Sequence, residues 1–300
     1  MSDPPIPDLT AAVLGTGRMG SAMAERLAGQ GIAVVVYNRT AERATSLAER
    51  IGATVAATPA EAASRADIVI SMLADDLAVR ALYAGPDGVT AGIRAGAVAV
   101  DMSTVLPDTV RSIAADVRAR DAGILDAPVS GSVASALAGE LTIMVGGESA
   151  DLERARPVLE RLAGHVFHLG TLGNGAAMKL AVNTVIFGLN GALAEGLVLA
   201  ERNGIDRALA YDVLAASAAG APFVGYKRDA FVDPETTPVA FALSLAAKDL
   251  ALIRELADAS GTAMPQAATN LDTILAAERS AGKHADFSMV ASHLRQEGRR

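Results

Sequence analysis

Short β-rich runs alternate with helical patterns through the first 170 residues, and this alternation restricts the fold more than any other feature. The predicted strands are AAVLG, IAVVVYN, DIVISML, AVAVDMS, GILDAP and LTIMVGG. Between them, TAERATSLAERIG and LPDTVRSIAADVRARD are amphipathic, and the second has Pro107 in its first turn, a favoured position for proline. Such alternation predicts a parallel sheet with helices on both faces.

The β character ends after VFHLG at residues 166–170, and the chain is helical from Asn174 onward. A loop-like stretch at 220–238, GAPFVGYKRDAFVDPETTP, interrupts the helices. We expect its part from Ala221 to Pro238 to shape a pocket through Phe223, Tyr226, Lys227 and Arg228, and the alternative for its charged residues is that they face solvent. A chain of 300 residues with 51% hydrophobic residues can form two cores. We therefore predict an α/β domain in residues 1–170 and an all-α domain in residues 171–300.

The first predicted strand leads directly into a glycine-rich turn, in the segment AVLGTGRMGSAMAERLAGQG. The pattern GxGxxG allows a tight turn, a close approach of the backbone to a pyrophosphate, and packing of the next helix on the strand. Its position at the first strand of an alternating α/β region favours dinucleotide binding in a Rossmann fold over a simple turn. We expect the cofactor to contact Gly15, Gly17, Arg18, Met19 and Gly20.

The second strand ends in YNRT, where an NAD-selective site commonly has an acidic residue that binds the ribose 2′-hydroxyl. Asn38 is neutral and does not repel a 2′-phosphate, and the Arg39 guanidinium can bind one. This predicts NADP(H) in preference to NAD(H). The alternative is that Arg39 is an ordinary solvent-exposed arginine.

A single lysine lies in the apolar helical segment GNGAAMKLAVN, residues 173–183. Lys179 and Asn183 are four residues apart and share a helix face. The lysine either extends its ammonium group to water or is held in a pocket where it transfers a proton. The run from Ala176 to Ala200 is long enough to span a membrane, but polar residues interrupt it, so we expect a helix buried between domains or subunits.

Composition excludes several other functions. Net charge is −8 with both signs interspersed, and aromatic residues make up 3%, which argues against nucleic-acid binding. The chain has no cysteine, and its four histidines lack the spacing of a metal site, so we expect neither thiol catalysis nor a metal. The start, MSDPPIPDLT, lacks the features of a signal peptide, and we expect a cytoplasmic protein.

Two further segments follow predicted strands, at the sheet edge where α/β proteins bind ligands. The first is DMST, residues 101–104, and the second is DAPVSGS, residues 126–132. Ser130, Gly131 and Ser132 offer hydroxyl groups and accessible backbone amides that suit a carboxylate. Serine and glycine are also common in turns without any ligand, so this alternative stays open.

Together, five motifs resemble those of the β-hydroxyacid dehydrogenase family over nearly the whole chain. They are VLGTGRMG, DMST, DAPVSGSVASALAGELTIMVGG, GNGAAMKLAVN and AAKDL. The resemblance implies an N-terminal Rossmann domain, an all-helical C-terminal domain and a long helix between them that also builds a homodimer or tetramer. 6-Phosphogluconate dehydrogenase has a related lysine helix in a much longer chain.

The resemblance also implies roles for individual residues. Lys179 would be the catalytic acid and base with Asn183 as its polar partner, Ser130 and Gly131 would bind the substrate carboxylate, and Lys248 would approach the nicotinamide and the substrate. Further cofactor contacts would come from Asn38, Arg39, Thr40, Leu73 and Thr104. Ser132 replaces the second glycine of the commonest SGGxxGA loop and Ser135 replaces the later one, and this SGS form resembles glyoxylate and succinic semialdehyde reductases.

These observations predict an NADP-dependent oxidoreductase that interconverts a small β-hydroxyacid and its semialdehyde, or reduces glyoxylate or succinic semialdehyde. Hydride transfer to an aldehyde leaves an alkoxide, which a cationic lysine can stabilise and protonate. The alternatives are an imine reductase on the same scaffold and a noncatalytic NADP-binding protein.

Overall fold

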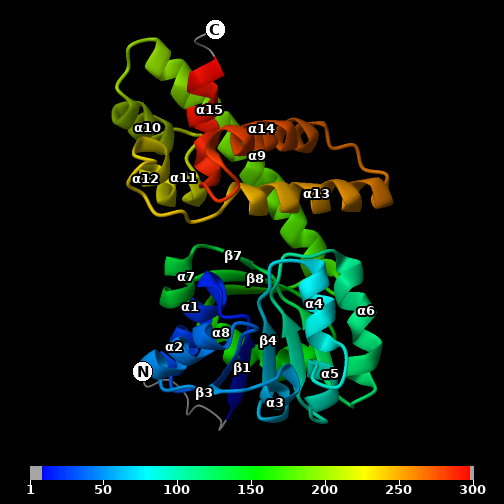
Figure 1. The fold of residues 1–300 in the computed structure, drawn as a ribbon. Helices are drawn as coiled ribbons and strands as arrows, with labels where there is room; N and C mark the ends of the chain where they lie inside the picture. The colour runs from blue at the N-terminus through cyan, green and yellow to red at the C-terminus, as the bar shows by residue number, and fades with distance from the viewer. Residues whose placement is uncertain (1–8, 298–300) are drawn as a thin grey trace. The chain divides into compact units, whose positions relative to one another are not determined.

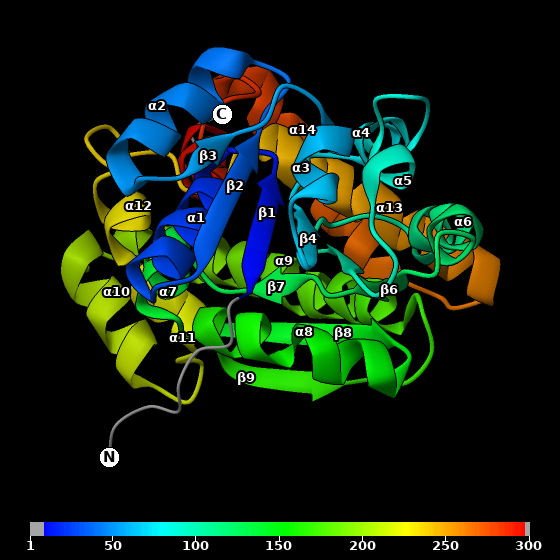
Figure 2. The same cartoon turned by 90° about the horizontal axis from the view of Figure 1, so that it is seen from below.

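A computed structural model describes residues 9–297, so most of the segment inspected for a signal peptide lies outside the described residues. Six parallel strands form the core of the sheet in the order β3-β2-β1-β4-β5-β6 (Figures 1 and 2). They are β1 (Thr10–Leu14), β2 (Ala33–Tyr37), β3 (Thr54–Val55), β4 (Ile68–Ser71), β5 (Val98–Asp101) and β6 (Gly123–Asp126). This is the strand order of a dinucleotide-binding fold. The chain adds strands towards one edge of the sheet from β1 to β3 and towards the other edge from β4 onward, so the order switches between the parallel neighbours β1 and β4.

Successive strand residues point to opposite faces of the sheet and enter two separate cores. Ala11 and Val13 pack with α1 (Arg18–Gly29), α2 (Ala41–Ile51) and α8 (Ser149–Leu162). Ala12 and Leu14 face the other layer, built by α3 (Pro59–Ser64), α4 (Asp76–Tyr83), α5 (Val89–Gly92) and α6 (Pro107–Arg118). The predicted arrangement, with helices on both faces, is confirmed.

Beyond β6 the sheet is no longer wholly parallel. β8 (Leu141–Gly147) pairs antiparallel with β6 and with β7 (Val129–Ser130), while β9 (Ala163–His168) runs parallel to β8. A short helix, α7 (Val133–Ala138), lies between β7 and β8 in the chain. The sequence did not predict β3 or β7, because a strand of two residues has no detectable alternation.

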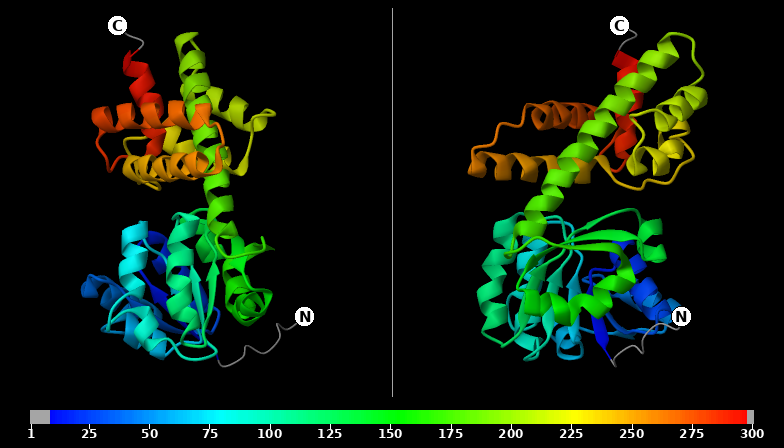
Figure 3. Two further views of the ribbon diagram at one scale, coloured as in Figure 1. Left: turned by 90° about the vertical axis from the view of Figure 1, so that its right-hand side faces the viewer. Right: turned by 180° about the vertical axis from the view of Figure 1, so that it is seen from behind.

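The long helix α9 (Asn174–Arg202) is continuous (Figure 3). Contacts divide the chain inside it, into a unit that ends at Lys179 and a unit that begins at Leu180. The predicted domain limit at 170/171 lies just before the helix. The division falls later because the first turn of α9 is hydrogen-bonded to Asp126 of the sheet unit.

The second unit is helical, as predicted. It contains α10 (Arg207–Ala216), α11 (Pro222–Tyr226), α12 (Arg228–Val232), α13 (Leu243–Ser260), α14 (Pro265–Ala281), the 3₁₀ turn η1 (Phe287–Met289) and α15 (Val290–Glu297). The stretch expected to be loop-like thus holds two short helices, the first started by Pro222. Five-residue helices are too short to show helical periodicity.

Several aromatic side chains form the centre of the helical unit's core. Phe287 packs edge-on against Phe187, Phe223 and Phe241, with ring centroids 5.4 to 6.2 Å apart. Phe187 comes from α9 and is 3% exposed, so this part of α9 is held by the unit's own core.

Other faces of α9 are less covered than the sequence suggested. The helix is long and apolar enough to cross a membrane by length and composition alone, a test that long core helices also pass. Only 33% of its most apolar segment is buried within the chain, and Val185 and Leu199 are more than half exposed. The expectation of burial on most sides is therefore not met within a single described chain.

Candidate active site

The turn between β1 and α1 uses Gly15 and Gly20 as the sequence predicted. Gly15 has a φ of 102°, and a Cβ there would lie 2.3 Å from the Met72 carbonyl oxygen. A Cβ on Gly20 would lie 2.0 Å from the Gly15 carbonyl oxygen, so Gly20 lets the helix pack on the turn. A Cβ on Gly17 would meet nothing within 4 Å, which leaves the backbone accessible to a ligand.

The start of α1 fits a pyrophosphate. No side chain caps this helix, and its first turn has no acidic residue, so its N–H groups and positive dipole end are available to an anion. The Thr16 hydroxyl is buried and has no hydrogen-bond partner among the described residues. Arg18 and Met19 open the helix itself.

Asn38 joins the two loops expected to surround the adenosine end of a cofactor. Its side-chain oxygen accepts a hydrogen bond from the Thr16 N–H at 3.1 Å, and its NH₂ group donates to the Thr40 carbonyl at 3.0 Å. An aspartate could accept the first bond but could not donate the second. Arg39 is exposed and forms no hydrogen bond or ion pair with any residue from 9 to 297.

A buried polar network links the next two loops. Asp101, at the end of β5, accepts hydrogen bonds from the hydroxyls of Ser71 at 2.7 Å and Ser103 at 2.9 Å. Ser103 in turn accepts a bond from the Leu73 N–H at 2.9 Å. This network holds Leu73, and Thr104 directly follows Ser103, so both predicted cofactor contacts lie beside it. Burial raises the pKa of Asp101 to about 6, and its second oxygen has no partner within the described chain.

The predicted carboxylate-binding loop is only partly free to bind a ligand. Ser132 caps α7 through a reciprocal capping box, in which Ser135 N–H donates to its hydroxyl and its own N–H donates to the Ser135 hydroxyl. Ser130 makes no side-chain hydrogen bond to any described residue. Gly131 has a φ of 141°, which disfavours any other residue. The loop therefore offers Ser130 and Gly131, while Ser132 shapes it.

Asp126 connects this loop to the lysine-bearing helix. Its Oδ1 accepts the Gly173 N–H and its Oδ2 the Ala176 N–H, both at 2.7 Å. Burial raises the pKa of Asp126, and these two backbone donors oppose that rise. Lys179 lies three residues after Ala176, in the second turn of α9.

In the helical unit, two residues predicted from separate motifs meet at one carboxylate. The buried Asn183 donates its NH₂ group to Asp249 Oδ2 at 2.8 Å, and Lys248 forms an ion pair with Asp249 Oδ1 at 2.8 Å. Asp249 is 2% exposed. Asn183 also lies one helical turn after Lys179 on α9.

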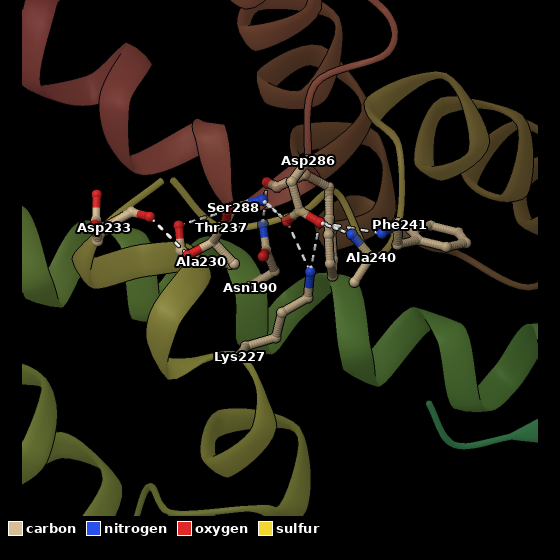
Figure 4. Close-up of polar contacts among 10 residues, drawn as sticks. Asn190, Lys227, Ala230, Asp233, Thr237, Ala240, Phe241, Asp286 and Ser288 are labelled. Carbon is tan, nitrogen blue, oxygen red and sulfur yellow. Dashed lines mark hydrogen bonds and ion pairs between the residues drawn. The ribbon is translucent and has the colours of Figure 1, made fainter. Parts of the chain in front are cut away.

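Lys227 does not face solvent, which was the alternative left open for the charges of the 220–238 stretch. Its ammonium group is buried and contacts both carboxylate oxygens of Asp286, at 2.7 and 2.9 Å (Figure 4). The same carboxylate accepts the N–H groups of Ala240, Phe241 and Ser288. The sequence could not reveal this pair, because its members lie 59 residues apart.

Sequence reasoning thus missed three organising carboxylates, Asp101, Asp126 and Asp249. Each stands inside a quoted motif, DMST, DAPVSGS or AAKDL, so the signal was an acidic residue within an otherwise apolar or small-residue segment. No group of three His, Cys, Asp or Glu side chains suited to a metal occurs among residues 9–297. The predicted absence of a metal stays a prediction.

Comparison with protein families matches both units. Residues 10–170 match the NAD-binding domain of 6-phosphogluconate dehydrogenase. Residues 173–294 match the family described as the NAD-binding domain of NADP-dependent 3-hydroxyisobutyrate dehydrogenase. The two matches together cover almost the entire described chain.

Individual relatives agree with these matches. The chain is 34% identical to an NAD-dependent L-serine dehydrogenase of Pseudomonas aeruginosa, over 93% of this chain and 95% of the relative. It is also 34% identical to the glyoxylate/succinic semialdehyde reductase 2 of Arabidopsis thaliana, over 94% of this chain and 78% of the relative. Among solved structures, 3-hydroxyisobutyrate dehydrogenase of Mycobacterium tuberculosis with L-serine superimposes with a TM-score of 0.83 at 32% identity, covering 96% of this chain and 100% of that one.

Proposed function

Because the chain belongs to the β-hydroxyacid dehydrogenase family, we propose that it interconverts a small β-hydroxyacid and its semialdehyde with NADP(H) as cofactor. Its class is that of an NAD(P)-binding dehydrogenase or reductase acting on hydroxyl groups. The observation that carries the proposal is the connection, through Asp126, between the free hydroxyl of Ser130 and the helix that bears Lys179.

The chemistry follows from these residue types. The bound nicotinamide supplies or accepts the hydride. The Lys179 ammonium donates a proton to the carbonyl oxygen as negative charge develops there, and in the reverse direction its neutral amine accepts the hydroxyl proton. The Ser130 hydroxyl and the Gly131 N–H bind the substrate carboxylate, which orients the carbonyl carbon for hydride transfer. Asn183, held by Asp249, completes the polar surface of the helix next to Lys179.

We propose NADP(H) because Asn38 is neutral and Arg39 is unpaired. One relative is described as NAD-dependent and the C-terminal family as NADP-dependent, so relatives do not decide the cofactor. In Arg39→Ala, the affinity for NADPH should fall at least tenfold while the affinity for NADH changes less than twofold. Equal changes in both affinities would refute the assignment.

The substrate is proposed to be a short aldehyde that carries a carboxylate, such as glyoxylate, succinic semialdehyde, tartronate semialdehyde or methylmalonate semialdehyde. Loss of nicotinamide absorbance with each aldehyde, measured with NADPH and NADH, tests both substrate and cofactor. The proposal expects turnover with at least one of them, faster with NADPH. The uncharged aldehyde of matched length serves as the control and should react poorly.

Reduction of cyclic imines is tested in the same assay. Turnover of an imine with no turnover of any carboxylate aldehyde would contradict the proposal and favour the imine-reductase alternative. Tight NADPH binding without turnover of either class would favour a noncatalytic protein.

We further propose that the chain forms a homodimer or tetramer through α9. The support is the exposed apolar surface of this helix, where Val185 is 62% and Leu199 67% exposed within one chain. Large apolar side chains exposed along one helix are typical of a face covered by a partner.

A further inference from the structure

We propose that Asp126 is a positioning residue for Lys179, which fixes the start of the lysine helix against the substrate-binding loop. This inference rests on the proposed function, because it assigns Asp126 to the proton transfer that Lys179 performs. It concerns residues of the sheet unit and the first turns of α9 only.

The carboxylate of Asp126 is the cap of α9. Its two oxygens accept two different N–H groups at the helix start, Gly173 and Ala176, each at 2.7 Å. The side chain is 0% exposed. Both oxygens are thereby engaged at once, which fixes the position and the tilt of the first turn more tightly than a single capping bond does.

Glycines make this contact possible. A Cβ on Gly146 would lie 2.4 Å from Asp126 Oδ1, and a Cβ on Gly175 would lie 2.9 Å from Asp126 Oδ2 and 2.3 Å from the Met144 carbonyl oxygen. Gly173 has a φ of 96°, which other residues rarely adopt. The absence of a side chain at Gly146 of β8 and at Gly175 of α9 therefore leaves room for the Asp126 carboxylate between these two elements.

The same short segment reaches the substrate loop. Asp126 ends β6, and Ser130 ends β7 only four residues later. The residues between them are also held, since the Ala127 N–H donates to the Asp101 carbonyl at 2.7 Å and the Met144 N–H donates to the Pro128 carbonyl at 3.0 Å. A rigid path thus runs from Ser130 through Asp126 to the first turn of α9, one turn before Lys179.

The consequence is geometric. Proton transfer requires the lysine nitrogen within hydrogen-bond reach of the reacting oxygen, and a misplacement of about 1 Å can cost on the order of 100-fold in rate. A simple structural cap would contribute to stability and would not alter kcat selectively. The two roles are therefore separable by experiment.

The test compares Asp126→Asn with Asp151→Asn. Asp151 is a matched control, because it is also a buried carboxylate of the sheet unit that accepts a backbone N–H, from Ile124 at 3.2 Å, and its ion-pair partner Arg154 lies on α8, the same helix as Asp151. Asparagine keeps the shape of the side chain, but its NH₂ group cannot accept the second N–H. We expect Asp126→Asn to lower kcat by about 10- to 100-fold, with KM and the NADPH dissociation constant within about threefold of wild type. Asp151→Asn should keep kcat.

A double-mutant cycle with Lys179→Ala separates this inference from the proposed function. If Asp126 acts through Lys179, the double variant should be no slower than Lys179→Ala alone. Amide exchange at Gly173 and Ala176 should also become faster in Asp126→Asn but not in Asp151→Asn. Should Asp126→Asn fail to fold, Asp126→Ser retains a small capping oxygen and takes its place.

Three results would overturn the inference. The first is a kcat of the double variant that is lowered by the product of the two single losses. The second is an effect of Asp126→Asn on KM or NADPH binding rather than on kcat. The third is a normal kcat in Asp126→Asn while Lys179→Ala is inactive. Full activity of Lys179→Ala would instead contradict the proposed function itself.

Discussion

Single buried polar side chains determine how the loops around the candidate site are arranged. Asn38 joins the glycine-rich turn to the end of β2 through one accepted and one donated hydrogen bond. Asp101 likewise joins the loops after β4 and β5, because it accepts hydrogen bonds from the hydroxyls of Ser71 and Ser103. In both cases predicted cofactor contacts lie close by in the chain: Arg39 and Thr40 follow Asn38, itself a predicted contact, and Thr104 lies three residues after Asp101.

Asp101 also makes the stability of the protein depend on pH. Burial raises its pKa from 3.8 to about 6, so the folded state binds the proton more tightly than the unfolded state. The stabilising contribution of this group is therefore complete below pH 4 and is lost as pH rises through 6. The shift corresponds to about 3 kcal/mol.

Asp101→Asn removes this titration while preserving the shape of the side chain. The free energy of unfolding of the variant relative to wild type should increase by about 2 kcal/mol between pH 4 and pH 7. Urea unfolding at a series of pH values measures this difference. A difference that stays constant with pH would mean that Asp101 has no raised pKa in the folded protein.

At the scale of elements, the Lys227–Asp286 pair holds together the short helices of the second unit. Asp286 lies just before η1, Lys227 separates α11 from α12, and the N–H groups of Ala240 and Phe241 lie just before α13 (Figure 4). The Lys227 ammonium also lies 4.4 Å from the centre of the Phe287 ring. Four segments are thus joined at one buried carboxylate, and α13 carries Lys248 and Asp249.

Removing one member of this pair leaves a buried charge without its counterion. Lys227→Met should lower the free energy of unfolding by about 3 kcal/mol or more. The neighbouring variant Arg228→Met is the matched control, because Arg228 forms an exposed ion pair with Asp212, and it should cost less than about 1 kcal/mol. Equal losses in chemical denaturation of the two variants would show that the buried pair is not a structural centre.

Long elements were predictable from sequence and short ones were not. The strands β1, β2, β4, β5 and β6 and the helices α1, α2, α6 and α9 have enough residues to be recognised in the sequence. The conformations of β7, α11 and α12 depend on contacts with the rest of the protein, because these elements are too short to show a period. The Ser132–Ser135 capping box was not predicted, because both serines were interpreted as departures from a family motif. Contacts between distant residues, such as Asp126 with Ala176, cannot be inferred from periodicity at all.

For the whole molecule, the assignment to an α/β nucleotide-binding unit and an all-helical unit followed from the alternation of strands and helices and from its end after residue 170. The tight turn at Gly15 and the close packing at Gly20 were both predicted from the sequence. Only the structure revealed that Ser132 caps a helix while Ser130 has no side-chain hydrogen bond within the described residues. Only the structure revealed the hydrogen bonds of Asp101, Asp126 and Asp249. Sequence therefore predicted the candidate site, and burial and hydrogen bonding identify the side chains that hold its loops in place.

The exposed face of α9 leads to a prediction about assembly. Wild-type protein should sediment as a dimer or tetramer at micromolar concentration, since the exposed Val185 and Leu199 provide an apolar surface for association. Val185→Lys combined with Leu199→Lys should shift it towards monomer. Leu77→Lys is the control, because Leu77 is 79% exposed but lies on α4 of the sheet unit. A wild-type monomer at all concentrations would contradict the proposed assembly.

The most direct test of the central claim is the turnover of Lys179→Ala with NADPH and the aldehyde that the wild type reduces best. If Lys179 is the proton donor, kcat should fall by about 10³-fold while NADPH binds with nearly unchanged affinity. Lys283→Ala, which removes an exposed lysine of the helical unit, should leave kcat unchanged. Near-normal turnover of Lys179→Ala with intact NADPH binding would contradict the account.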